Sequence, residues 1–155
     1  PLSVMGTDVA EFVTRAKATA FTDMLGLNDV IITGDTVVLL DDEILEKPSN
    51  FEEAALMLRK LSGRTHVVAS GVAVTTLIGG RPKTSCEVDT CEVTFEELTE
   101  DMISHYIDSY KPFDKAGSYG VQDLIGFIGV SSINGSFYTV MGLPVHILHK
   151  MLQEV

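Results

Sequence analysis

The amino-acid sequence predicts an α/β domain in which helices flank a mixed, twisted β-sheet. Segments whose apolar residues recur three and four apart, as on one face of a helix, alternate with the short apolar runs typical of strands. This order favours a sheet covered by helices over a helical bundle or a repeat array. With 155 residues, of which 45% are hydrophobic, the chain can bury a core, and its length fits a single domain over residues 1–155.

The first helix is expected to begin at Thr7, because threonine is a good N-cap and the apolar residues that follow it have helical spacing. Gly26 is expected to end the helical region. Two apolar runs, residues 30–32 and 37–40, then predict buried strand on either side of Gly34-Asp35-Thr36.

The middle of the chain predicts a helix followed by a long hairpin. Ser49 and Glu52 have the spacing of a capping box ahead of a helical apolar pattern. Residues 67–77 and 85–95 then have strand character, and the segment 79–82 between them is expected to form an irregular turn.

The last third of the chain predicts two helices with a hairpin between them. Thr99 is expected to cap the first of these helices, and the turn residues around Pro144 are expected to start the second. Between them, the strand pattern returns at Ile125, the dipeptide Asn134-Gly135 favours a tight turn, and residues 137–140 are expected to continue as strand.

Composition argues against several classes of function. The formal net charge of −11 disfavours sequence-independent binding to a nucleic-acid backbone, which requires clustered lysine and arginine. The apolar runs are too short to cross a bilayer, and residues 1–6 lack the pattern of a secretory signal, so a cytoplasmic protein is expected. Cys86 and Cys91 do not form a Cys-x-x-Cys pair, so a zinc site has little support.

Asp35 is the first candidate for chemistry. Its carboxylate follows Gly34 within a predicted buried strand, where burial is unfavourable unless a cation or hydrogen-bond donors are present. The functional interpretation is a metal ligand or a general base for a water molecule. The alternative is a strand-bulge aspartate whose oxygens accept hydrogen bonds from backbone amides.

Residues 111–122 form the second candidate region. Lys111 and Lys115 lie in one loop with Gly117 and Gly120, and cations combined with open backbone amides are what an anion cradle requires. The loop contains no Walker-type phosphate motif.

Lys47 and Gln122 are weaker candidates. Lys47 precedes Pro48, which restrains its backbone, so its side chain is placed to reach a pocket rim. The alternative is a solvated lysine that balances nearby glutamates. The Gln122 amide both donates and accepts, as the edge of a uracil-like base requires, although an ordinary surface glutamine also fits.

Taken in order, Gly34-Asp35-Thr36, Lys47-Pro48 and the segment Asp114 to Gln122 resemble the pocket of the Maf family of nucleoside triphosphate pyrophosphatases. The segments 15–18, 57–66, 71–73, 134–136 and 140–144 also resemble signatures of that family. The resemblance runs from about residue 7 to the C-terminus and implies a Maf/ITPase-like fold. Family members open with a strand and a Ser-x-x-Arg-Arg type loop. This sequence begins downstream of both, so we expect that strand and loop to be missing from the chain.

The resemblance implies hydrolysis of a nucleoside triphosphate between the α and β phosphates, with help from a divalent cation, Mg²⁺ or Mn²⁺. It assigns catalytic roles to Asp35, Lys47 and Lys115, with Asp35 as the base and as a metal ligand. It assigns substrate binding to Lys17, Thr36 and Gln122, of which the last two help to choose the base.

The form D-K-A-G-x-Y-x-x-Q, found here at residues 114–122, is typical of family members that act on dTTP and UTP. Members that prefer 7-methyl-GTP lack the lysine and the glutamine, so the resemblance implies a cytoplasmic house-cleaning enzyme for pyrimidine nucleotides and a homodimer. One departure is Asp123, where glycine is common. The alternative interpretation is a catalytically impaired nucleotide-binding or scaffold module.

Overall fold

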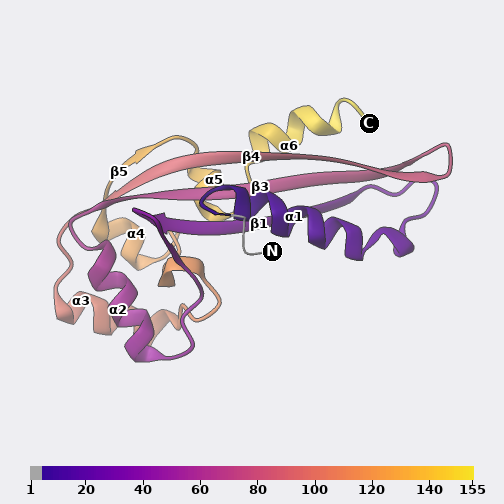
Figure 1. Ribbon diagram of the computed structural model, residues 1–155. Coiled ribbons are helices and arrows are strands. Elements are labelled where there is room, and N and C mark those ends of the chain that lie inside the picture. Colours follow the sequence, from indigo (N-terminus) through magenta and orange to yellow (C-terminus); the bar gives the residue numbers. More distant parts are fainter. Residues whose placement is uncertain (1–4) are drawn as a thin grey trace.

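An antiparallel five-stranded sheet forms the centre of the fold, with the order β2-β1-β3-β4-β5 (Figure 1). The computed structural model describes residues 5–155. The strands are β1 (Ile31–Leu40), β2 (Glu43–Leu45), β3 (Thr65–Ile78), β4 (Arg81–Phe95) and β5 (Val130–Asn134). The predicted α/β class is confirmed, but the prediction of a mixed sheet is corrected, because each pairing between neighbouring strands is antiparallel. Short turns join β1 to β2 and β3 to β4, and such turns permit only antiparallel pairs.

Helices cover both faces of the sheet (Figure 1). They are α1 (Asp8–Ala20), α2 (Phe51–Leu61), α3 (Glu100–Tyr110), α4 (Leu124–Gly129), α5 (Phe137–Met141) and α6 (Val145–Leu152), with the 3₁₀ turns η1 (Thr22–Met24) and η2 (Ala116–Ser118). On one face, α1 packs against Val37, Leu39 and Ala69. Because side chains alternate along a strand, Val38 and Val68 face the opposite side, where they join the main core with α2 and α3. None of the helices within residues 5–155 is long and apolar enough to cross a bilayer.

The hairpin of β3 and β4 is confirmed, but its turn is regular. Ile78 pairs with Arg81, which leaves Gly79 and Gly80 as the only residues of the turn. Their φ angles are +59° and +75°, the left-handed values that a two-residue hairpin turn of type I′ requires at both positions. The predicted irregular turn is therefore wrong, because two glycines meet the backbone requirement of the tightest connection.

The region after Ile125 differs from its prediction. Residues 124–129 form α4, residues 130–134 form β5, and residues 137–141 form α5, so the predicted strand at 137–140 is wrong. Gly135 has a φ of +134°, and a Cβ atom there would lie 2.8 Å from Cys91 Sγ. The glycine therefore lets the chain pass close to β4, and contacts of α5 with β3 and β4 override the local strand preference.

The strand predicted around Asp35 is continuous, from Ile31 to Leu40. Its second half is buried as predicted, but Val30 precedes the strand and is 42% exposed, and Ile32 is 44% exposed. The prediction of burial is therefore wrong for these two residues. The reason is that β2 pairs only with residues 38–40 of β1, so no strand within residues 5–155 covers the outer edge of the first half of β1.

The N-terminus of α2 is capped one residue later than predicted. The Asn50 side chain accepts a hydrogen bond of 2.9 Å from the Glu53 backbone N–H, and the Glu53 carboxylate accepts one of 2.8 Å from the Ser49 backbone N–H. Asn50 and Glu53, not Ser49 and Glu52, thus form a variant of the capping box, in which the carboxylate accepts from the residue before the cap.

Replacement of Asn50 by alanine is expected to lower the free energy of unfolding by about 1 kcal/mol, because one backbone N–H at the helix start loses its acceptor. Ser49→Ala is the matched control and is expected to change the stability by less than about 0.5 kcal/mol, since Ser49 contributes its backbone N–H. Urea unfolding of the two variants measures both effects. A larger loss in Ser49→Ala than in Asn50→Ala would contradict the assigned cap.

Candidate functional site

One pocket lies along the outer edge of β1, between α1, the segment before α2, the loop 111–122 and α5. It is lined by all of the predicted site residues: Lys17, Asp35, Thr36, Lys47, Lys115 and Gln122. Asp114, Tyr119 and Met141 also line it; they belong to segments that carry the resemblance, but no role was assigned to them from the sequence. Lys111, which the loop pattern had suggested as a second cation, lies outside the lining. The structure therefore brings together predicted site residues as far apart in the sequence as Lys17 and Gln122.

Asp35 forms an ion pair with Lys17. The Lys17 Nζ atom lies 2.6 Å from Asp35 Oδ1 and also donates to the Gly34 carbonyl oxygen at 3.1 Å. Asp35 sits in a continuous strand, directly opposite Gly71 of β3, so the alternative of a bulge aspartate bound by backbone amides does not describe it. A cationic partner replaces the hydration that a partly buried carboxylate loses.

The charges of Lys115 and Lys47 both act on the Asp114 carboxylate. Lys115 Nζ donates to Asp114 Oδ1 at 3.0 Å, and this hydrogen bond lowers the pKa of Asp114, with a smaller contribution from the charge of Lys47. Lys47 reaches this position because the Glu46 carbonyl oxygen accepts a hydrogen bond from the Gly117 N–H, which ties the segment before α2 to the loop.

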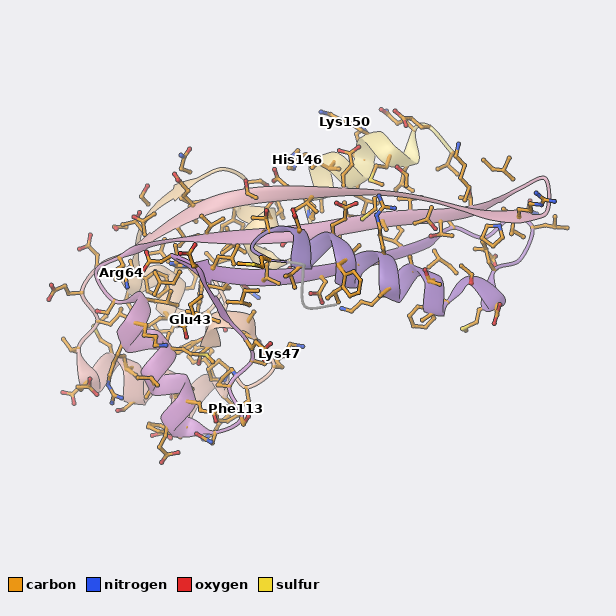
Figure 2. The ribbon with its side chains drawn as sticks, in the orientation of Figure 1. Glu43, Lys47, Arg64, Phe113, His146 and Lys150 are labelled. Carbon is orange, nitrogen blue, oxygen red and sulfur yellow. The ribbon has the colours of Figure 1, made fainter. Side chains whose placement is uncertain are left out.

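Figure 2 shows Lys47 on the chain between β2 and α2, below the sheet. The alternative was an exposed lysine that balances Glu43 and Glu46. Lys47 is exposed, as that alternative expects, but Glu43 is paired with Lys60 at 2.6 Å and Lys47 lines the pocket. The pocket thus has two lysines on its loop side and a third, Lys17, on its helix side. Such a group of cations is suited to a polyphosphate, in a protein whose overall charge is strongly negative.

The loop is held in place by a buried tyrosine of α3. The Tyr106 hydroxyl donates to Asp123 Oδ2 at 2.9 Å and accepts from the Gly120 N–H at 3.0 Å. Burial raises the pKa of Tyr106, so the hydroxyl keeps the proton that it donates. Asp123 therefore has a structural partner here. Sequence reasoning placed Tyr106 only in the apolar pattern of a helix, because its hydroxyl bonds go to residues beyond that helix.

Below the loop, His66 supports Tyr119. His66 Nε2 lies 2.7 Å from the Tyr119 hydroxyl, and both rings pack edge-on against Phe95. His66 is 2% exposed, and this burial lowers its pKa to about 4. The imidazole is therefore neutral at physiological pH, and Tyr119 joins the pocket wall to the core.

The pocket can accept a divalent cation together with a ligand. No group of three or more His, Cys, Asp or Glu side chains suited to a metal occurs in the described part of the chain. However, Mg²⁺ is commonly held by one or two carboxylates, with substrate phosphates and water completing its coordination. Asp35 and Asp114 both place carboxylates in this pocket, and Asp35 Oδ2 has no hydrogen-bond partner among residues 5–155. The residues present therefore fit a cation that arrives with a phosphate ligand.

The chain is similar to a known family along nearly its whole length. A family model described as "Maf-like protein" matches residues 4–155. A Bacteroides fragilis (strain YCH46) protein named "dTTP/UTP pyrophosphatase" is 44% identical over 155 residues, which cover all of this chain and 78% of that protein. A protein of the same name from Porphyromonas gingivalis (strain W83) is 46% identical, over 92% of this chain and 71% of its own length. Another, from Flavobacterium psychrophilum, is 40% identical, over 98% of this chain and 76% of its own length.

The buried His66 is expected to make stability depend on pH. Its folded pKa of about 4 lies below the ordinary value of 6.5, so the unfolded chain binds more protons in that window. The stabilisation is present above pH 6.5 and is lost as the pH falls, by on the order of 3 kcal/mol. Urea unfolding from pH 7 to pH 4 measures this loss against His66→Gln, in which we expect a shallower dependence. His149→Gln, at an exposed position, serves as the control. Equal pH dependence in wild type and His66→Gln would contradict this account.

Proposed function

The chain belongs to the Maf-like family, and from that premise we propose that it hydrolyses dTTP and UTP to the nucleoside monophosphate and pyrophosphate. One observation carries the proposal: a carboxylate and three lysines converge on one pocket in a chain that matches proteins named dTTP/UTP pyrophosphatase over all or nearly all of its length. The role would be to remove nucleotides from the cytoplasmic pool, and residues 1–155 would act as one domain.

Asp35 is the residue that we assign as general base. A water molecule attacks the α phosphorus, its proton passes to the Asp35 carboxylate, and the bond from that phosphorus to the oxygen that bridges the β phosphate breaks. Pyrophosphate leaves with the bonding electron pair. Lys17, already 2.6 Å from Asp35 Oδ1, holds this carboxylate in place and faces the same pocket. Removal of a proton by a positioned carboxylate is general base catalysis.

Lys47 and Lys115 are assigned to the phosphates. Negative charge accumulates on the leaving pyrophosphate as the bridging bond breaks, and positioned cations stabilise such charge most strongly in the transition state. A divalent cation, Mg²⁺ or Mn²⁺, would be held by Asp35 together with phosphate oxygens and would supply further neutralisation of charge. The Asp114 carboxylate binds Lys115 in the structure, so phosphate binding exchanges one anionic partner of this lysine for another.

Thr36 and Gln122 are assigned to the base. Both line the pocket, together with the apolar side chains of Val38, Val68 and Met141. Apolar walls with a few polar groups are the usual environment for a planar base. A Gln amide donates and accepts, which suits a uracil or thymine edge that presents both carbonyl oxygens and an imide N–H.

The experiment that tests the function is pyrophosphate release by the full-length protein from dTTP, UTP, CTP and 7-methyl-GTP, with Mg²⁺ or Mn²⁺. We expect turnover of dTTP and UTP and much slower turnover of the other two. Tight binding without any pyrophosphate release would instead support the alternative of a catalytically impaired nucleotide-binding module. Preferred turnover of 7-methyl-GTP would contradict the assigned substrate class.

Asp35→Asn is expected to lower kcat by about a thousandfold, because the amide cannot accept the proton of the attacking water. Asp42→Asn, in the exposed turn after β1, is the matched control and is expected to keep the wild-type rate. Steady-state pyrophosphate release measures both. Unchanged activity of Asp35→Asn would remove Asp35 from its role as base.

Lys115→Gln is expected to raise the KM for UTP by about tenfold or more, because a charge-assisted contact with phosphate is lost. Lys111→Gln removes the same charge from the same loop, at an exposed position outside the pocket lining, and is expected to leave KM unchanged. Equal effects of the two substitutions would show that overall charge, and not the position of Lys115, governs binding.

The same proposal includes a homodimer, a cytoplasmic location and no nucleic-acid partner. The first of these is supported by analogy with the family, and the last by the net charge of −11. Light scattering coupled to size-exclusion chromatography measures the molar mass in solution and so tests the oligomeric state. The mass of a monomer would contradict the homodimer.

A further inference from the structure

A chain of buried hydroxyl groups lies behind Thr36 and leads away from the pocket. Thr36 Oγ1 lies 2.7 Å from Ser70 Oγ, which in turn donates to the Thr139 carbonyl oxygen at 2.7 Å. Thr36 Oγ1 also lies 3.4 Å from the Gly142 carbonyl oxygen. Ser70 and Thr139 are both fully buried, so water does not compete for these hydrogen bonds.

The number of hydroxyl protons in this hydrogen-bonded series determines whether Thr36 donates to a ligand or accepts from it. Each hydroxyl has one proton, and the acceptors available within the protein are the carbonyl oxygens of Thr139 and Gly142. The Thr139 carbonyl oxygen can only accept, so Ser70 uses its single proton in that hydrogen bond. The 2.7 Å contact between Thr36 and Ser70 then requires Thr36 to donate to Ser70. The Thr36 proton is therefore used inside the protein, and a lone pair of Oγ1 faces the pocket.

We propose that Ser70 is a positioning residue that makes the Thr36 hydroxyl a hydrogen-bond acceptor toward the pocket, so that the pocket selects a base with a ring N–H. This inference rests on the proposed function in one respect, namely that the pocket takes a pyrimidine nucleotide. Uracil and thymine carry a proton on N3, which can donate to Thr36. Cytosine has an unprotonated N3, whose lone pair would face that of Thr36 and remain unpaired.

Thr139, at the far end of this series of hydroxyl groups, is held in place by further hydrogen bonds, which keep the series rigid. The Thr139 hydroxyl donates to Asp89 Oδ2 at 2.5 Å, and this bond ties α5 to β4. The carbonyl oxygen of Thr139 also accepts the Gly142 N–H at 3.1 Å. Ser70 therefore meets an acceptor whose position is fixed from two sides. A buried and fully paired network of this kind holds its members in one orientation.

Binding of reaction products tests this inference without relying on turnover. Isothermal titration calorimetry gives the Kd of UMP and of CMP for the wild type, Ser70→Ala and Thr36→Val. We expect the wild type to favour UMP, and we expect Ser70→Ala to reduce the ratio of the CMP Kd to the UMP Kd by about tenfold, the equivalent of one hydrogen bond. Thr36→Val should lower the same ratio of Kd values. In the double variant, the ratio should fall no further than in either single variant.

Thr75→Val is the matched control. It removes another buried hydroxyl from β3, one that bonds to Thr84 at 2.9 Å outside the pocket lining, and it should keep the wild-type ratio. If Ser70→Ala weakens UMP and CMP equally, or leaves the ratio unchanged, Ser70 has only a structural role and the proposal fails.

A second measurement needs no variant. N3-methyl-UMP lacks the donor, and we expect the wild type to bind it at least tenfold more weakly than UMP. Equal affinities would overturn the inference even if Ser70→Ala did not fold. Absence of pyrophosphate release with a retained preference for UMP would contradict the proposed function and leave the orientation of Thr36 supported. Turnover of UTP with equal affinities for UMP and CMP would support the proposed function and contradict the proposed orientation of Thr36.

Discussion

The close approach of α1 to the sheet at Gly71 is the packing constraint on which the pocket depends. A Cβ atom on Gly71 would lie 2.8 Å from the Ala10 carbonyl oxygen and would also collide with the Thr14 side chain. Gly71 pairs with Asp35 across the ladder of β1 and β3, so the helix passes directly over that pair. Its last turn carries Lys17, and the short distance between helix and sheet lets this lysine reach both Asp35 and the Gly34 carbonyl oxygen.

The opposite face of β3 explains why Thr36 of the pocket has a buried polar partner between two apolar clusters. Val68 belongs to the core formed with α2 and α3, whereas Val72 and Val74 belong to the cluster formed with α6. Ser70 lies between these clusters on the same face, because side chains alternate along the strand. A buried hydroxyl is tolerated there only because α5 brings the Thr139 carbonyl oxygen to it. The polar partner of Thr36 thus lies at the boundary between two apolar clusters.

Local rules predicted most elements, and tertiary contacts decided the rest. The cap of α3 at Thr99 followed from residue type and spacing alone. Residues 137–140 have strand composition but form a helix, since their contacts with β3 and β4 override that preference. For the site, Asp35 and the loop were found from their own sequence context. Ser70 and Tyr106 were not, because Ser70 acts on a partner 69 positions away and Tyr106 on one 17 positions away.

The reaction proposed for this pocket is cleavage of a pyrimidine nucleoside triphosphate between its α and β phosphates. The most direct measurement is ³¹P nuclear magnetic resonance of UTP during incubation with the full-length protein and Mg²⁺. We expect UMP and pyrophosphate to appear in equal amounts from the earliest time points. Formation of UDP and inorganic phosphate, or the persistence of UTP at high protein concentration, would contradict it.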